Sequence, residues 1–276
     1  MLKHRSLIIL LSVSFCFLLP LMLCSSEKRQ KNDKVKFSKR FQQKWGKCPI
    51  KVRQQILSNN ITGTFPSSKT VEKSAERFYT SLDYLPASLI RKSGLKYVTF
   101  LRNLELNNKT AGGIASGDTI YLPVNFNTKS LFHEFFHIFD PHRQDANWRK
   151  LNNKKFKYTG SQFYTVDMTK KEKRQAKKIN RKDDIEDSFV SSYAMSFEHE
   201  DRAETFAYMI VEGKNFLKRT KNPVIKAKML YIMNLFIKKN LLSKEFWEKH
   251  FDSKFKLKNR FYSNGSNKNT SGTSKR

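Results

Sequence analysis

The stretch His133-Glu134-Phe135-Phe136-His137 has the pattern HExxH, and it decides how the rest of the chain is interpreted. Helical residues four apart lie about 40° apart around the axis, so both imidazoles can reach one ion. The carboxylate of Glu134 is then placed to act on a water bound to that ion. A catalytic zinc ion also needs a third protein ligand and one open position. The pattern therefore predicts two of the three protein ligands and leaves the third to be found elsewhere in the chain.

The third ligand does not follow the HExxH stretch directly. The extended metzincin pattern places a glycine three residues and a histidine six residues after the second histidine. Here Asp140 and Arg143 occupy those positions, which excludes that class. The stretch 191–209 (SSYAMSFEHEDRAETFAYM) is a better source, because Glu200 and Glu204 lie four apart on a predicted helix. Two acids beside its apolar stripe are costly if buried without a cation, but unremarkable if exposed, so periodicity leaves both readings open.

Three motifs, HEFFHIFD from 133, SSYA from 191 and EDRAETFA from 200, carry a resemblance to a known family. They resemble the gluzincin branch of zinc peptidases, most closely the anthrax lethal factor and Pro-Pro endopeptidase type. Those proteins carry HExxH, then SY, then ExxAE within a helix, with the same tyrosine-to-glutamate interval. The resemblance implies that His133, His137 and Glu200 bind one Zn²⁺ ion, with Glu134 as the general base.

The same resemblance implies roles for two further side chains. Tyr193 matches the tyrosine that stabilises the transition state, and Glu204 matches the second carboxylate of the helix, which supports the ligands from behind. Asp201 and Arg202 stand where those relatives carry aromatic residues, which bears on substrate preference.

Two residues next to the motifs have two interpretations each. Asp140 lies one helical turn after His137, where it either orients that imidazole or bonds to a loop at the helix end. His199 is a neighbour of Glu200, but adjacent helical residues point in different directions, so we expect it to point away from the ion.

The segment 110–124 (TAGGIASGDTIYLPV) holds three glycines among β-forming residues. It predicts a strand, a bend and a second strand, with bare backbone where another group approaches closely. The relatives bind an extended peptide along the edge strand of a small sheet. By resemblance, the residues expected to bind substrate through strand addition are Gly112, Gly113, Ile120 and Tyr121.

Hydrophobic periodicity organises the rest of residues 70–258 into an α+β, zincin-like metallopeptidase domain. We expect a small mixed sheet, an active-site helix and C-terminal helices. Predicted helices run from 70 to before 94, from 127 to 140, from 196 to 213, from 223 to 236 or 239, and from 243, and a strand covers 95–104. Residues 141–187 are charged and irregular.

The N-terminus has the form of a secretory signal. Lys3, His4 and Arg5 precede an uncharged run over 6–23 and small residues after it, which predicts a signal peptide over 1–26. A retained membrane anchor and lipidation at Cys24 remain alternatives, and each of them places the rest of the chain outside the cell. A basic polar lead-in over 27–69 and a disordered tail over 259–276 flank the domain.

The formal net charge of +30 raises the question of a polyanionic partner. The basic residues are spread along the whole chain without a recognition-helix or base-stacking pattern, which favours a solvated basic surface over a specific nucleic-acid site. Attraction to an anionic cell wall or membrane stays open. Cys48 is the one cysteine beyond the signal region, so no intrachain disulfide is expected.

These observations predict a secreted or surface-held, monomeric, zinc-dependent endopeptidase that acts on a peptide or protein. One alternative is a catalytically inactive protein on the same scaffold that binds anionic surfaces. A purely structural zinc module is less favoured, because closed zinc sites use four ligands, often cysteines.

Overall fold

The computed structural model describes residues 50–140, 145–160, Arg174 and 186–252. The predicted signal segment, Cys48, the tail and most of the basic stretch between 161 and 185 lie outside the described residues. The chain divides into two units, Met1–Asn32 and Asp33–Arg276, and all described residues belong to the second. Within that described part, no helix combines the length and the apolar character needed to cross a bilayer.

A six-stranded mixed sheet is built around its longest strand, β3. The strands are β1 (Lys51–Val52), β2 (Ile61–Thr64), β3 (Tyr97–Leu106), β4 (Lys109–Thr110), β5 (Ile114–Ser116) and β6 (Thr119–Pro123). The order is β1-β3-β6-β5, and β2 and β4 pair with β3. Strands β1 and β6 run parallel to β3, whereas β2, β4 and β5 run antiparallel to their partners. The predicted small mixed sheet is confirmed.

Residues 50–69, which the sequence assigns to the polar lead-in, contribute to this sheet. Strand β1 pairs with β3 through Val52 and Val98, and β2 pairs with β3 through Ile61 and Leu106. Ile50 is fully buried in the core. The folded part of the chain therefore includes these residues.

The helices follow the predicted periodicity, with one difference. They are α2 (Ser68–Leu82), α3 (Ala87–Lys92), α4 (Thr128–Phe139), α5 (Ala146–Arg149), α7 (Glu198–Glu212), α8 (Pro223–Lys238) and α9 (Lys244–Phe251), with 3-10 helices η1 (Glu186–Ser188), η2 (Tyr193–Met195) and η3 (Gly213–Lys221). The stretch from 70 to 94 is two helices, and Pro86 lies at the N-terminus of the second. Pro223 and Ser243 begin α8 and α9 as predicted, and the Ser243 hydroxyl accepts from the backbone N–H of Phe246.

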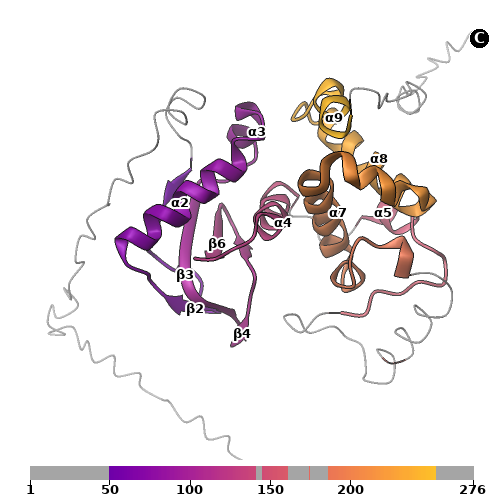
Figure 1. Cartoon of the computed structure of the whole chain (residues 1–276). Coiled ribbons are helices and arrows are strands. Elements are labelled where there is room, and N and C mark those ends of the chain that lie inside the picture. The colour runs from indigo at the N-terminus through magenta and orange to yellow at the C-terminus, as the bar shows by residue number, and fades with distance from the viewer. Residues whose placement is uncertain (1–49, 141–144, 161–173, 175–185, 253–276) are drawn as a thin grey trace, which may run out of the picture. The chain divides into compact units, whose positions relative to one another are not determined.

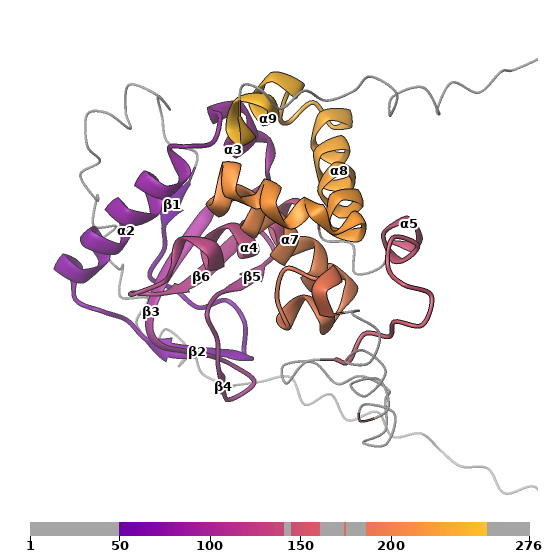
Figure 2. The ribbon, with the colours of Figure 1, turned by 45° about the vertical axis from the view of Figure 1, so that its right-hand side comes forward.

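Helix α4 lies between the sheet and α7 (Figures 1 and 2), in contact with β5 and β6 on one side and with α7 on the other. Its phenylalanines form this packing. Phe136 contacts Phe206 of α7 at a centroid distance of 5.3 Å, and Phe206 stacks on Phe236 of α8 at 4.9 Å. Full burial of such aromatic side chains stabilises the fold by about 1.5–3 kcal/mol each. This packing fixes α4 against α7, and it therefore fixes the positions of His133 and His137 relative to Glu200.

Candidate metal centre

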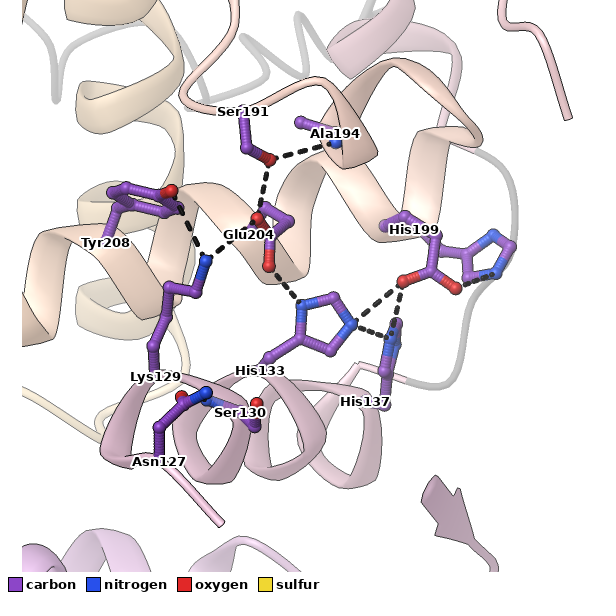
Figure 3. A network of polar contacts seen from close by, with 11 residues as sticks. Asn127, Lys129, Ser130, His133, His137, Ser191, Ala194, His199, Glu204 and Tyr208 are labelled. Carbon is purple, nitrogen blue, oxygen red and sulfur yellow. Dashed lines mark hydrogen bonds and ion pairs between the residues drawn. The ribbon is translucent and has the colours of Figure 1, made fainter. Parts of the chain in front are cut away.

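The two histidines of the HExxH stretch project from the same side of α4. Asn127 caps the N-terminus of the helix, and its side chain accepts a hydrogen bond from the Ser130 N–H at 2.7 Å. Further along α4, the Nε2 atoms of His133 and His137 lie 3.0 Å apart (Figure 3). Both rings therefore face one point, as the four-residue spacing predicts.

The first turn of α7 supplies the third group. Glu200 is 1% exposed, and its Oε2 lies 2.9 Å from His133 Nε2 and 3.3 Å from His137 Nε2. Carboxylates in the first turn of a helix are favoured by the partial positive charge of the helix N-terminus. Of the two readings that periodicity leaves open for Glu200, the buried one is therefore observed.

The three side chains fit a zinc ion. Donor atoms 2.0–2.1 Å from a tetrahedral ion lie roughly 3.3 Å from one another, and here the three separations are 2.9, 3.0 and 3.3 Å. Among the described residues, His133, His137 and Glu200 are the group whose donor atoms gather within 4.8 Å of one another.

The hydrogen bonding of His133 points to a cation in the same place. Its Nδ1 lies 3.0 Å from Glu204 Oε1, and a carboxylate oxygen only accepts, so Nδ1 carries the proton. In the neutral ring Nε2 is then an acceptor, 2.9 Å from a second acceptor on Glu200. A proton or a metal ion between them removes this repulsion. Burial lowers the pKa of His133, but the hydrogen bonds with Glu200 and Glu204 outweigh burial and raise it well above its usual value.

Glu204 is itself held from two sides. Its Oε2 accepts from the Ser191 hydroxyl at 2.6 Å and lies 3.8 Å from the Lys129 ammonium. Burial raises the pKa of Glu204, but the bonds from His133 and Ser191 outweigh burial and lower it. Sequence reasoning gave no role to Ser191 or Lys129, although Ser191 opens the SSYA motif.

Glu134 lies beside the three candidate ligands without joining them. Its carboxylate is buried, lines the cleft and accepts a hydrogen bond from the Ala115 backbone of β5. Burial raises the pKa of Glu134 above its usual value, partly offset by the nearby imidazoles. A carboxyl group with a raised pKa, close to but outside the cation position, suits proton transfer.

A cleft of about 530 Å³ opens over these groups. Its lining includes Gly112, Gly113 and residues of β5 and α4, together with Tyr193 and His199. The Tyr193 side chain is 36% exposed, and its ring centroid lies 5.8 Å from that of His133. The structure thus brings Tyr193 and the two glycines to the cleft, as predicted.

Two predicted substrate residues are not at the cleft. Ile120 and Tyr121 are 0% and 1% exposed in β6, which β5 covers. Tyr121 packs in a separate apolar cluster, and its hydroxyl accepts from the Leu57 N–H. The strand at the end of the sheet is β5, which belongs to the predicted segment, whereas Ile120 and Tyr121 lie in the neighbouring strand β6.

Asp140, which lines the end of the cleft, forms a buried ion pair with Arg202 of α7. The Asp140 carboxylate accepts from Arg202 Nε at 2.9 Å, which ties the end of α4 to α7. Arg202 also donates to Glu198. Of the two interpretations of Asp140, the structure therefore supports a role at the helix end, with α7 as the partner instead of a loop.

Asp201, in contrast, does not line the cleft. It is fully buried and bonds to Lys228 of α8, Trp148 Nε1 and the Tyr158 hydroxyl. Asp201 and Arg202 thus serve the packing of α7, and neither side chain lines the cleft.

His199 lies beside the candidate ligands, and the donor group His133, His137 and Glu200 does not include it. Its side chain nevertheless comes closer than its helical angle suggests, because its Nε2 lies 3.3 Å from Glu200 Oε1 and it lines the cleft. It is the second residue of α7, where the first turn brings it to the side of Glu200.

Comparison with known proteins adds the family. A comparison with curated proteins gave no match. Among solved structures, the chain is similar to a crystal structure at 2.10 Å of a "putative zinc-binding metallo-peptidase" from Bacteroides caccae, with 13% identity over 77% of this chain and 87% of that chain and a TM-score of 0.48. A family model described as "Putative zinc-binding metallo-peptidase" matches residues 92–258, more than half of the chain. The protein therefore belongs to this family of zinc-binding metallopeptidases.

Proposed function

We propose that this protein is a zincin of the gluzincin type, an endopeptidase that binds one zinc ion through His133, His137 and Glu200. The observation that carries the proposal is the convergence of these three donors, 2.9–3.3 Å apart, from two helices. When bound, zinc lowers the pKa of a water molecule and polarises a carbonyl group. Membership of a zinc-binding peptidase family supports the same assignment.

The residues around the ion have separate tasks in hydrolysis. Glu134 takes a proton at its carboxylate as water attacks the scissile carbonyl, and it then delivers that proton to the leaving amine. The Tyr193 hydroxyl donates a hydrogen bond to the oxyanion that develops on the carbonyl. Glu204 holds the Nδ1 proton of His133, which keeps Nε2 free to bind the ion.

An extended peptide is the substrate that this cleft suits. Strand β5 stands at the end of the sheet order and lines the cleft beside Glu134. Pairing of a peptide with an edge strand uses main-chain hydrogen bonds and places successive side chains on alternate sides. Recognition of this kind does not require a free chain end, which favours cleavage within a chain.

Metal content and cleavage of a proteome-derived peptide library test this proposal together. The wild-type protein should hold one zinc ion and cleave peptides, whereas Glu134→Gln should hold zinc and cleave none. Glu200→Gln should lose both. A matched control is Glu212→Gln on the same helix, whose partner is Arg219, and it should keep both. A wild-type protein that never binds zinc ends the proposal.

A second candidate is an inactive scaffold that binds anionic polymer or membrane, which the net charge of +30 favours. It predicts salt-sensitive binding to anionic vesicles that survives Glu134→Gln, without cleavage by the wild type. For either function we propose a location outside the cell, supported by the signal-like segment 1–26. Determination of the mature N-terminus tests that location.

A further inference from the structure

His199 sits where α7 begins, against the face of Glu200 that is turned from the two candidate histidine ligands. Its side chain is 15% exposed and lines the cleft. The ring is fixed from two sides, with Phe197 stacked at a centroid distance of 5.4 Å and His137 tilted at 5.6 Å. Figure 3 shows His199 reaching one carboxylate oxygen while His133 and His137 reach the other.

The two oxygens of Glu200 are therefore divided between two kinds of partner. Oε2 lies 2.9 and 3.3 Å from the ring nitrogens of His133 and His137, at the position that suits the ion. Oε1 lies 3.3 Å from His199 Nε2. A carboxylate oxygen only accepts hydrogen bonds, so Nε2 of His199 is the donor.

We propose that His199 is a positioning residue that holds Glu200 as a one-oxygen ligand of the metal. A carboxylate can bind a cation through one oxygen or through both, and a donor on Oε1 competes with the second mode. A ligand that uses one oxygen leaves the fourth position of a tetrahedral ion open for water. This inference rests on the metal site of the proposed function, but it does not depend on whether hydrolysis occurs.

The alternative, that His199 is a fourth protein ligand, is disfavoured by geometry. Its ring nitrogen is adjacent to Oε1, while the atoms that gather within 4.8 Å of one another in the described part of the chain come from His133, His137 and Glu200. A fourth protein ligand also closes the site, as in structural zinc centres.

The arrangement has a parallel on the same helix. Glu204, one turn further along α7, accepts from Nδ1 of His133 and fixes that ligand from behind. Helix α7 thus carries a candidate ligand, Glu200, and a supporting residue on each side of it. Partners of this kind typically change metal affinity by 10–100-fold when they are lost.

Two substitutions distinguish the effect of the His199 N–H donor from the effect of its aromatic ring. His199→Phe keeps a ring in the stack but removes the donor, whereas His199→Gln keeps a donor on a side chain of similar reach. Zinc affinity is measured by competition with a chelator, and ligand geometry is measured from the visible spectrum of the cobalt(II)-substituted protein. We expect His199→Phe to lower zinc affinity by about 10–100-fold and to weaken the tetrahedral cobalt bands. His199→Gln should keep most of the affinity and the wild-type spectrum.

Three results overturn the inference. Unchanged zinc affinity and cobalt spectrum in His199→Phe mean that the contact does not position Glu200. Equal losses in both variants mean that the imidazole ring, not its donor, matters. Complete loss of zinc in His199→Phe, with unchanged circular dichroism, means that His199 is itself a ligand. A wild-type protein that binds zinc but cleaves no peptide refutes the proposed activity, while the zinc and cobalt measurements still decide the role of His199.

Discussion

Gly113 and Glu134 lie so close together that only a residue without a side chain fits at position 113. A Cβ atom there would lie 2.6 Å from Glu134 Cγ and 2.9 Å from its Oε1. The bare backbone predicted for the glycine-rich segment therefore accommodates the side chain that we propose as the general base. A Cβ atom added at Gly112 would instead lie 3.5 Å from its nearest neighbour, Ser130 Oγ, which is an ordinary van der Waals contact.

The two glycines form a matched pair of variants. Gly113→Ala should lower kcat about 100-fold, because a displacement of the base by roughly 1 Å is enough for such a loss. Zinc content should stay at the wild-type level, since Glu134 is not among the candidate ligands. Gly112→Ala should keep kcat near the wild-type value, because its Cβ would meet no atom of Glu134, and any loss from its place in the cleft should fall on KM. Equal activity of the two variants would contradict the proposed role of Glu134.

Tyr193→Phe should lower kcat on the order of 100-fold with little change in KM or zinc content, because it removes one hydrogen bond to the developing oxyanion. The ring, whose centroid lies 5.8 Å from that of His133, keeps its packing in the variant. Steady-state kinetics on a peptide identified in the library measures this effect. A loss confined to KM would assign Tyr193 to substrate binding instead.

Lys228→Met should lower the free energy of unfolding by about 3–5 kcal/mol, because it leaves the Asp201 carboxylate buried without its cation. The Lys228 ammonium is 2.8 Å from Asp201 Oδ2, with side chains 1% and 0% exposed. Urea unfolding measures the loss. Lys96→Met is the matched control, since the exposed Lys96–Asp118 pair should contribute less than about 1 kcal/mol. A similar small effect at both positions would show that the buried pair does not stabilise the packing of α7 against α8.

His250 should make stability fall on acidification. Burial lowers the pKa of His250, and the hydrogen bond from its Nε2 to the Met209 carbonyl offsets this only in part. As pH falls below about 6.5, the unfolded chain takes up a proton that the folded chain refuses. Stability is therefore fully present above that pH and declines below it, with a slope of at most about 1.4 kcal/mol per pH unit.

Urea unfolding of the wild type and of His250→Gln between pH 7.5 and 5.5 checks this expectation. The variant keeps a donor for the Met209 carbonyl but cannot titrate, so its stability should decline less steeply. Other titrating groups are present in both proteins and cancel in the comparison. Parallel pH profiles would mean that His250 titrates alike in both states.

Local patterns in the sequence predicted the parts of the fold that local physics controls. The HExxH spacing on α4, the Pro223 start of α8 and the Ser243 cap of α9 each depend on residues within one turn of a helix. The spacing of Glu200 and Glu204 on α7 was also evident from the sequence, but the burial of these two residues was not. Burial of Glu200 depends on how α7 docks on α4, and no periodicity reports that.

Strand pairing and side-chain reach were harder to predict. Strand β1 has two residues, and it joins the sheet through Val98, far along the chain. The predicted substrate segment covers both the short β5 and the longer β6, and the sequence alone does not show which of the two lies at the edge. The helical angle of His199 shows that it is offset from Glu200, but not how close its side chain comes to the Glu200 carboxylate. Ser191 carries no pattern of its own, and the resemblance to known peptidases is the signal that could have drawn attention to it.

Because His133 and His137 come from one helix and Glu200 from another, a bound cation would add a further link between α4 and α7, which apolar packing and the Asp140–Arg202 pair already join. Separation of α7 from α4 should then be accompanied by release of the ion. Amide exchange would measure the separation, and metal dissociation would measure the release. If the proposed site binds zinc, the lifetime of the folded protein would therefore depend on the zinc concentration around it, because loss of the ion would also loosen α7 from α4.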